Sequence, residues 1–373
     1  MEYKKFAYLI EKKRRNEEIK VEDLMHHRKE CYHYAKVNKL LPFLVSVVDK
    51  YPCEDDENYK KQWKEEALQA ILREYRKIPL VKALVEEAEK EGIKLVFFKG
   101  YILADLYHDF SIRQSGDTDI YVSKEDKDGA IKLLERNGYR RERKLDKEQV
   151  LTYCYYEGEE CFHKIELHFS LYEDMEGEQI EKLTELDLTD QNKLVKINCC
   201  NMEIYSMGHR EHLIYQMFHM IKHFIYQGIS VRYCLDITWF LEKYGNEIDM
   251  KSFWCSMEYL GYKRFSQVFM SLCTKYFHLD PVIYGEQNYI ETEEIDQLLQ
   301  DLVSFGAREY GKDVAHYYVI FNILYEKLDK KESRADSLFN GEIIDYQQVP
   351  KEFQDNPKLQ ERFLFVKKLG LFH

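Results

Sequence analysis

Gly-Asp-Thr-Asp-Ile-Tyr-Val, residues 116–122, alternates polar and apolar side chains, which is typical of a β-strand with one buried face. Residues two apart on a strand share a face, so Asp117 and Asp119 should project together from the polar side. The residues at the alternate positions should project from the other side, into a core. This stretch therefore predicts a sheet with two carboxylates on one face.

A second strand, predicted over residues 162–171, repeats the arrangement. Its apolar residues alternate with Glu166 and His168, which therefore share its polar face. If the two strands are neighbours in one sheet, the carboxylates of Asp117, Asp119 and Glu166 converge.

The surrounding chain predicts an α+β fold with a mixed sheet of about four to six strands, a usual sheet size. Further strands are expected at 94–98, 151–156, 193–198 and 202–205, and helices at 102–107, 124–137, 209–226 and 231–244. Pro79 and Gly92 carry the start and stop signals of another helix. The predicted parts are an N-terminal helical region (1–92), a domain of alternating strands and helices that carries the acidic residues (93–205) and a C-terminal helical domain (206–373).

Composition narrows the possible functions of the 373-residue chain. The net charge of −12 argues against a protein that clamps a long nucleic acid, because phosphate binding requires a basic surface. The nine cysteines are odd in number and form no CxxC motif, which favours a reduced, cytoplasmic protein. No run approaches ~20 apolar residues, so no membrane span is expected. The 30 tyrosines and 21 phenylalanines are interpreted mainly as packing between helices, with a ligand-stacking surface as the alternative.

Three converging carboxylates repel one another, which costs free energy, and bound divalent cations remove that cost. Mg²⁺ prefers carboxylate oxygens together with substrate phosphates, and two such ions can clamp an in-line phosphoryl displacement. The alternative is that Asp117 and Asp119 lie on the solvated face of an ordinary antiparallel strand.

Two upstream features fit an anion site. Gly100 follows a buried strand and opens a helix, so the backbone there can approach phosphate oxygens, and Lys99 adds a positive charge. Arg113 lies between that helix and the acidic strand, where it can hold a triphosphate. The alternatives are a simple strand-to-helix turn for Lys99-Gly100 and a surface salt bridge for Arg113.

Taken together, these segments resemble the uncharacterised nucleotidyltransferase family of the DNA polymerase beta-like superfamily. The resemblance rests on residues 97–100, 103–107, Arg113, 116–122 and 165–168, followed by Lys222-His223, Arg232 and Asp236. In that superfamily a glycine motif opens a helix, and a strand of alternating hydrophobic and aspartate residues supplies two metal ligands. A third carboxylate on a later strand, matched here by Glu166, completes the set.

The resemblance implies transfer of a nucleoside monophosphate from a nucleoside triphosphate, with ATP as the expected donor, to a hydroxyl acceptor. Asp117, Asp119 and Glu166 would be catalytic and bind two Mg²⁺ ions, and Glu166 would also take the acceptor proton. The nucleotide-binding residues would be Lys99, Gly100, Arg113 and Gly116. The wall of the acceptor or nucleotide site would include His168, His223, Arg232 and Asp236. The acceptor itself, a small molecule or a protein, is not identified.

Three other interpretations remain open. His219 and His223 are four residues apart, the spacing of helical zinc ligands, although no glutamate base accompanies them and a packing role is the alternative. Arg140 to Lys144 is a basic run that either attracts a phosphorylated acceptor or protects an edge strand from pairing. The whole fold can also serve as a non-catalytic nucleotide-binding or protein-interaction module.

Overall fold

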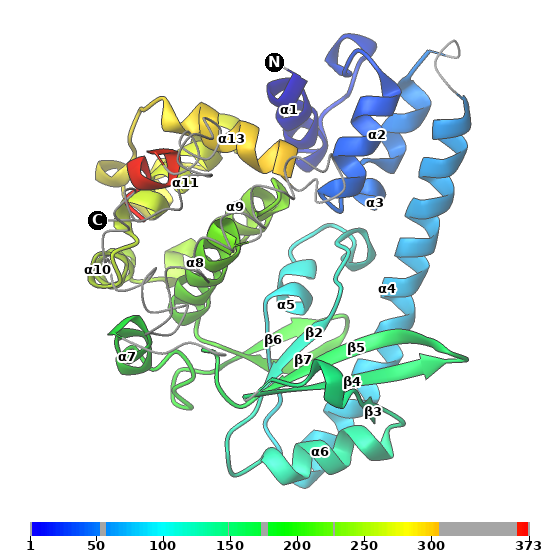
Figure 1. Ribbon diagram of the computed structural model, residues 1–373, viewed down its shortest axis with the longest axis vertical. Helices are drawn as coiled ribbons and strands as arrows, with labels where there is room; N and C mark the ends of the chain where they lie inside the picture. The colour runs from blue at the N-terminus through cyan, green and yellow to red at the C-terminus, as the bar shows by residue number, and fades with distance from the viewer. Residues whose placement is uncertain are drawn as a thin grey trace, which may run out of the picture. The chain divides into compact units, whose positions relative to one another are not determined.

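The computed structural model describes residues 2–52, 57–147, 149–172, 178–226, 228–305 and 364–371 (Figure 1). These residues form two compact units. A helical unit contains the described parts of 1–63, 175–186 and 213–373. A sheet-containing unit contains those of 64–174 and 187–212. The three-part division expected from the sequence stays a prediction.

The sheet unit is built on one mixed seven-stranded sheet, one strand more than the upper end of the expected range. The strands are β1 (Val96–Phe98), β2 (Thr118–Tyr121), β3 (Arg140–Arg141), β4 (Val150–Glu157), β5 (Glu160–His168), β6 (Val195–Cys199) and β7 (Met202–Ser206). Their order across the sheet is β3-β4-β5-β2-β1-β7-β6 (Figure 1). The added strand is the two-residue edge strand β3, so the basic run forms an exposed edge, as one of the two interpretations predicted.

Two parallel pairings make the sheet mixed. Strand β2 is parallel to β5 and antiparallel to β1, while β1 is parallel to β7. The other neighbouring strands are antiparallel. In the β2–β5 pairing Asp119 lies directly opposite Glu166. The two acid-bearing strands expected from the sequence are therefore neighbours.

One face of the sheet is covered by a hydrophobic core. It receives Phe97, Ile120, Ile165 and Leu167 from the strands. Buried residues of α4 (Glu57–Glu91), α5 (Gly100–Ala104) and α6 (Lys127–Arg136) complete it, including Val81, Leu84, Tyr101, Ile102, Leu133 and Leu134. Because side chains alternate along a strand, this core leaves Asp119, Glu166 and His168 on the opposite face.

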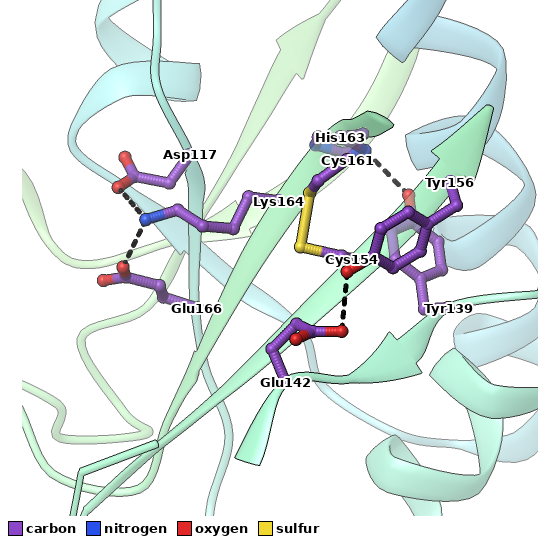
Figure 2. Close-up of a disulfide and its surroundings, with 9 residues drawn as sticks. All are labelled: Asp117, Tyr139, Glu142, Cys154, Tyr156, Cys161, His163, Lys164 and Glu166. Carbon is purple, nitrogen blue, oxygen red and sulfur yellow. Dashed lines mark hydrogen bonds and ion pairs between the residues drawn. A yellow bond between two sulfur atoms is a disulfide. The ribbon is translucent and has the colours of Figure 1, made fainter. Parts of the chain in front are cut away.

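The β4–β5 and β6–β7 hairpins turn at residues whose backbone has a positive φ. Gly158 (φ 62°) turns between β4 and β5, and Cys200 and Asn201 (φ 50° and 59°) turn between β6 and β7. The first hairpin brings Cys154 and Cys161 together as a disulfide with Cα atoms 5.5 Å apart (Figure 2). The expectation of a wholly reduced chain is thus wrong for this pair, because strand pairing rather than a sequence motif joins them. The other described cysteines are free.

The helical unit draws its helices from both ends of the sequence. They are α1 (Glu2–Arg14), α2 (Arg28–Val37), α3 (Leu41–Leu44), the start of α4, α7 (Glu178–Glu185), most of α8 (His209–Tyr226), α9 (Arg232–Tyr244), α10 (Met250–Tyr259), α11 (Lys263–Phe277), α12 (Pro281–Tyr284) and α13 (Glu294–Phe305). Short 3-10 turns accompany them at Val21–Asp23, Val45–Lys50, Gly245–Glu247 and Glu286–Asn288, and in the sheet unit at Phe110–Ile112 and Arg143–Leu145.

Buried polar contacts tie the two ends of the chain together within the helical unit. Asn38, fully buried, donates from Nδ2 to the Val303 carbonyl and accepts at Oδ1 from the Val231 backbone N–H. Arg14 pairs with Glu11 and donates to the Phe277 carbonyl. Such buried groups are costly unless bonded, so these contacts specify how the N- and C-terminal helices meet.

Helix α4 differs from its prediction. It runs without interruption through Pro79, which the sequence marks as a helix start. A proline in the first turn of a helix removes no intrahelical hydrogen bond. Within α4, Pro79 removes one backbone hydrogen bond, and packing must offset that loss. The C-terminal signal is correct, since the helix ends at Glu91 and Gly92 has φ 72°. No described helix is long and apolar enough to cross a membrane. The predicted helical character of residues 306–363 lies outside the described residues.

His163 is held neutral inside the core of the sheet unit. Its ring bonds to Thr118 Oγ1 (2.8 Å) and to the Tyr139 hydroxyl (2.7 Å; Figure 2). Burial lowers its pKa to about 3. The same cause lowers the pKa of His212 to about 3.

These two histidines should make the protein sensitive to acid. Below pH ~6.5 the unfolded chain binds protons at these positions while the folded chain does not, so stability falls as pH drops from about 6.5 toward 3. Each histidine contributes a slope of up to about 1.4 kcal/mol per pH unit. Urea unfolding at pH 7.5, 6 and 5 should show a shallower slope for His163→Gln than for wild type. Equal slopes would contradict a neutral, buried His163.

Candidate functional site

Asp119 is the most buried carboxylate on the open face of the sheet, with only 3% of its surface exposed. Its Oδ1 contacts the Lys99 ammonium at 2.9 Å and the Nε2 of His168 at 3.1 Å. Burial alone would raise the pKa of Asp119, but the positive charge of Lys99 and the contacts with His168 outweigh it and hold the pKa well below its usual range. Asp119 therefore stays ionised. Its burial contradicts the alternative that it lies on a solvated strand face.

Glu166 and His168 complete a compact group of ligand atoms with Asp119. They lie two residues apart on β5, and His168 is fully buried with its ring edge-on to Phe98. One ligand atom from each of Asp119, Glu166 and His168 lies within 4.8 Å of the others. Among the described residues this is the one group of three or more such side chains able to hold a metal ion.

Asp117 joins the group through a lysine. It lies just before β2 and is half-buried. The ammonium of Lys164 contacts Asp117 Oδ2 at 3.1 Å and Glu166 Oε1 at 2.8 Å (Figure 2). Burial lowers the pKa of Lys164, but the charge of Asp117 and the hydrogen bond to Glu166 raise it overall. The Lys164 ammonium thus bridges the two carboxylates and balances part of their negative charge.

A buried ion pair positions the segment before Asp117. Lys77 and Glu74 of α4 contact each other at 2.9 Å, and both side chains are at most 5% exposed. Lys77 also donates to the Ser115 carbonyl, and Glu74 accepts from the Ser115 backbone N–H. Ser115 Oγ in turn donates to the Asp117 carbonyl at 2.6 Å. The ion pair therefore fixes where Asp117 enters the sheet.

The Lys99-Gly100 turn has a strained backbone and close packing. Lys99 has φ 53° and ψ −123°, a conformation that side chains rarely adopt, and its N–H donates to His212 Nε2 at 3.1 Å. At Gly100 a Cβ atom would lie 2.5 Å from Ser115 Oγ, so a larger residue would displace this hydroxyl from the Asp117 carbonyl. Arg113, 5% exposed, donates to the Gly100 carbonyl at 3.0 Å. Arg113 is therefore not a surface salt-bridge residue.

The remaining residues of the predicted site belong to both units. Gly116 lies in an exposed bend beside Asp117. His223, on α8, and Arg232 and Asp236, on α9, belong to the helical unit, and their predicted place in a substrate wall stays a prediction. His219 and His223 contact each other through their Nε2 atoms at 2.9 Å, and no third metal ligand joins them among the described residues.

Sequence reasoning identified Lys99 and Arg113 but missed Lys164 and the side chains that position the site. Lys164 shares its strand face with Glu166, so alternation alone could have identified it. The contacts of Glu74, Lys77 and His212 join residues 38 to 113 positions apart, and no local pattern predicts such contacts.

Removing the Lys164 charge should strengthen cation binding. The ammonium lies between two carboxylates and repels a second cation, so Lys164→Gln should raise the affinity for Mg²⁺ or Mn²⁺ by roughly tenfold, or about 1.4 kcal/mol. Isothermal titration calorimetry on the nucleotide-free protein would measure this change. Lys196→Gln, the same charge change at an exposed lysine of β6, is the matched control. Equal affinities for the two variants would contradict the expected role of Lys164.

Comparison with known proteins identifies the family of the chain. No curated protein matches the sequence. One solved structure, the crystal structure of an antigenic nucleotidyltransferase-like protein from Paracoccidioides brasiliensis, is similar over 46% of this chain and 76% of that one, with 14% sequence identity and a TM-score of 0.31. Residues 27–278 match the family described as "Uncharacterised nucleotidyltransferase". Because that match spans more than half of the sequence, the chain belongs to the uncharacterised nucleotidyltransferase family.

Proposed function

We propose that the protein transfers a nucleoside monophosphate from a nucleoside triphosphate, with ATP as the expected donor, to a hydroxyl group of a small molecule or protein. The observation that carries this proposal is the parallel β2–β5 register, which sets Asp119 directly opposite Glu166. Asp117 lies two residues from Asp119 and shares Lys164 with Glu166. Three carboxylates gathered on one open sheet face suit the cations that accompany a triphosphate.

The three carboxylates share the proposed work. Asp117 and Asp119 would hold the cation of the triphosphate, and together with Glu166 they would hold a second cation near the acceptor. Glu166 would also accept the proton of the attacking hydroxyl. The hydroxyl oxygen forms a bond to the α-phosphorus while the bond to the bridging oxygen breaks, and pyrophosphate leaves with that electron pair. Mg²⁺, in two ions, would neutralise phosphate charge and stabilise the in-line displacement.

The observed contacts support a fit to these cations. Lys99 and Lys164 both place ammonium groups on the carboxylates, so the acids already attract positive charge. The Asp119 carboxylate is ionised and buried, which strengthens its interaction with a cation.

The nucleotide end of the site is proposed to lie at the Lys99-Gly100 turn and the Gly116 bend. Lys99 would offer its charge to phosphate oxygens when a cation takes its place on Asp119. Arg113 braces the turn through the Gly100 carbonyl, and further donors of its guanidinium would contact the triphosphate. His168, His223, Arg232 and Asp236 are proposed for the wall around the acceptor or the base.

The first test is binding of nucleotide by the purified protein. Each nucleoside triphosphate is titrated with and without Mg²⁺, and the one that binds is then used in labelled form against a panel of hydroxyl acceptors. The proposal expects Mg²⁺-dependent binding, a labelled acceptor and release of pyrophosphate. Wild-type protein that binds no nucleotide in the presence of Mg²⁺ would refute it.

The same assay separates catalysis from the non-catalytic alternative. A binding module would retain nucleotide without releasing pyrophosphate with any acceptor in the panel. The close approach of Glu166 to Asp119 favours catalysis, because a module that only binds nucleotide does not require the third carboxylate.

A further inference from the structure

We propose that Asp119, Glu166 and His168 form a mixed carboxylate–imidazole site that binds a first-row divalent transition ion, such as Mn²⁺, before any nucleotide arrives. The role of this ion rests on the proposed function, because the ion would occupy the same site. Its occupancy is a property of the protein alone and can be measured without substrate. Mg²⁺ would then enter with the triphosphate.

The strand pairing assembles these three ligands from few residues. Asp119 and Glu166 face each other across β2 and β5, and His168 follows Glu166 by one strand repeat on the same face. The Nε2 atom of His168 lies 3.1 Å from Asp119 Oδ1 and 4.0 Å from Glu166 Oε2. Transition ions bind such nitrogen and oxygen atoms at about 2.0–2.2 Å. Ligand atoms within 4.8 Å of one another can therefore surround one ion after small side-chain rotations.

The histidine decides which ion the site prefers. Mg²⁺ takes oxygen ligands almost entirely and keeps several waters, whereas imidazole nitrogen suits first-row transition ions. His168 is fully buried, and its ring is held edge-on against Phe98 with centroids 5.1 Å apart. An imidazole held in this way loses little freedom on binding an ion, so it contributes to affinity rather than only lining the site.

The contacts of Asp117 explain why this acid is not one of the three ligands and remains for the nucleotide. Asp117 is absent from the group of three and is bridged by Lys164 to the second oxygen of Glu166. Glu166 therefore offers Oε2 to the group with His168 while Oε1 contacts Lys164. Two carboxylates and an imidazole are thus assembled without nucleotide, and an ion that binds them displaces the Lys99 ammonium from Asp119 Oδ1. Asp117 becomes available when Lys164 moves away.

The test uses MnCl₂ with the nucleotide-free, full-length protein. Electron paramagnetic resonance counts bound Mn²⁺, and spin-echo modulation detects nitrogen coordinated to the ion. We expect one Mn²⁺ per chain with the modulation of one imidazole nitrogen, and an equal concentration of Mg²⁺ should leave most of that Mn²⁺ bound. No bound Mn²⁺, or bound Mn²⁺ without nitrogen modulation, would overturn the proposal. Because the wild-type spectrum decides, the test does not depend on a variant folding.

Two variants on the same strand sharpen the result. His168→Gln should lose the nitrogen signal and at least about tenfold of its Mn²⁺ affinity, since loss of even an outer-shell partner of a metal ligand costs 10–100-fold. Its Mg²⁺ affinity with nucleotide should change less. His163→Gln, which alters a buried histidine on the opposite face of β5, should keep the signal. Loss of the signal in both variants, or in neither, would reject His168 as the ligand.

Failure of this inference and failure of the proposed function give different results. If Mn²⁺ binds through nitrogen but no acceptor is labelled, the site stands and the transfer reaction fails. If labelling proceeds with Mg²⁺ while Mn²⁺ alone does not bind, the transfer reaction stands and the imidazole site fails.

Discussion

Asp119→Asn should reduce nucleotidyl transfer by about 10²–10³-fold or more, the usual cost of removing one preorganised electrostatic group from an active site. The carboxylate is buried, ionised and in contact with Lys99 and His168. Asparagine has nearly the same shape as aspartate but lacks the negative charge that binds the cations. Transfer is measured as pyrophosphate release with the acceptor identified in the screen. Asp117→Asn combined with Asp119→Asn should abolish both turnover and Mg²⁺-dependent nucleotide binding.

Asp128→Asn provides the matched control for this experiment. It makes the same change of charge at an exposed position of α6, on an element that packs against the other face of the sheet. Its activity should equal that of wild type. Urea unfolding of each variant separates lost chemistry from lost folding. A folded Asp119→Asn protein with wild-type turnover would remove Asp119 from the proposed mechanism.

Lys77→Met should lower the free energy of unfolding by about 3–5 kcal/mol, the usual cost of leaving one partner of a buried ion pair alone. The substitution leaves the Glu74 carboxylate in an interior position without its cation and removes the bond to the Ser115 carbonyl. Because Ser115 holds the backbone at Asp117, Mg²⁺-dependent nucleotide binding should weaken as well. Urea unfolding measures the first effect and calorimetry the second.

The same helix carries a matched exposed pair. Lys82 and Glu86 lie 3.8 Å apart with more than half of each side chain exposed, so Lys82→Met should cost less than about 1 kcal/mol. Replacing both buried partners, as Lys77→Met with Glu74→Leu, should recover part of the lost stability, since no unpaired charge remains. Equal destabilisation by Lys77→Met and Lys82→Met would show that the buried pair has no special role.

Periodicity predicted much of the fold because it depends on neighbours in the sequence. Strands β1, β2 and β4 to β7 and helix α8 occur close to where alternation or helical spacing placed them. The helix stop at Gly92 is local too, because it requires only a positive φ. Pro79 is the counterexample. Its start signal is local, but α4 continues through it because packing on both sides outweighs the lost hydrogen bond.

The disulfide marks a second limit of local patterns. Cys154 and Cys161 form no recognisable motif, and only the β4–β5 hairpin brings their Cα atoms to 5.5 Å. Cysteine spacing alone therefore led to the wrong expectation for this pair. Strand pairing is a tertiary property whose register depends on both strands at once.

The sequence by itself determined that Asp117 and Asp119 lie two apart at the start of one strand, and that Glu166 and His168 share a face of another. Only the tertiary structure decided that these strands are parallel neighbours with Asp119 opposite Glu166. It also decided that Lys99 and Lys164 contact the acids and that Glu74 and Lys77 fix the entry of Asp117. The physical reason is that alternation is set within each strand by backbone geometry, whereas register and ion pairing are set by packing between segments far apart in the chain.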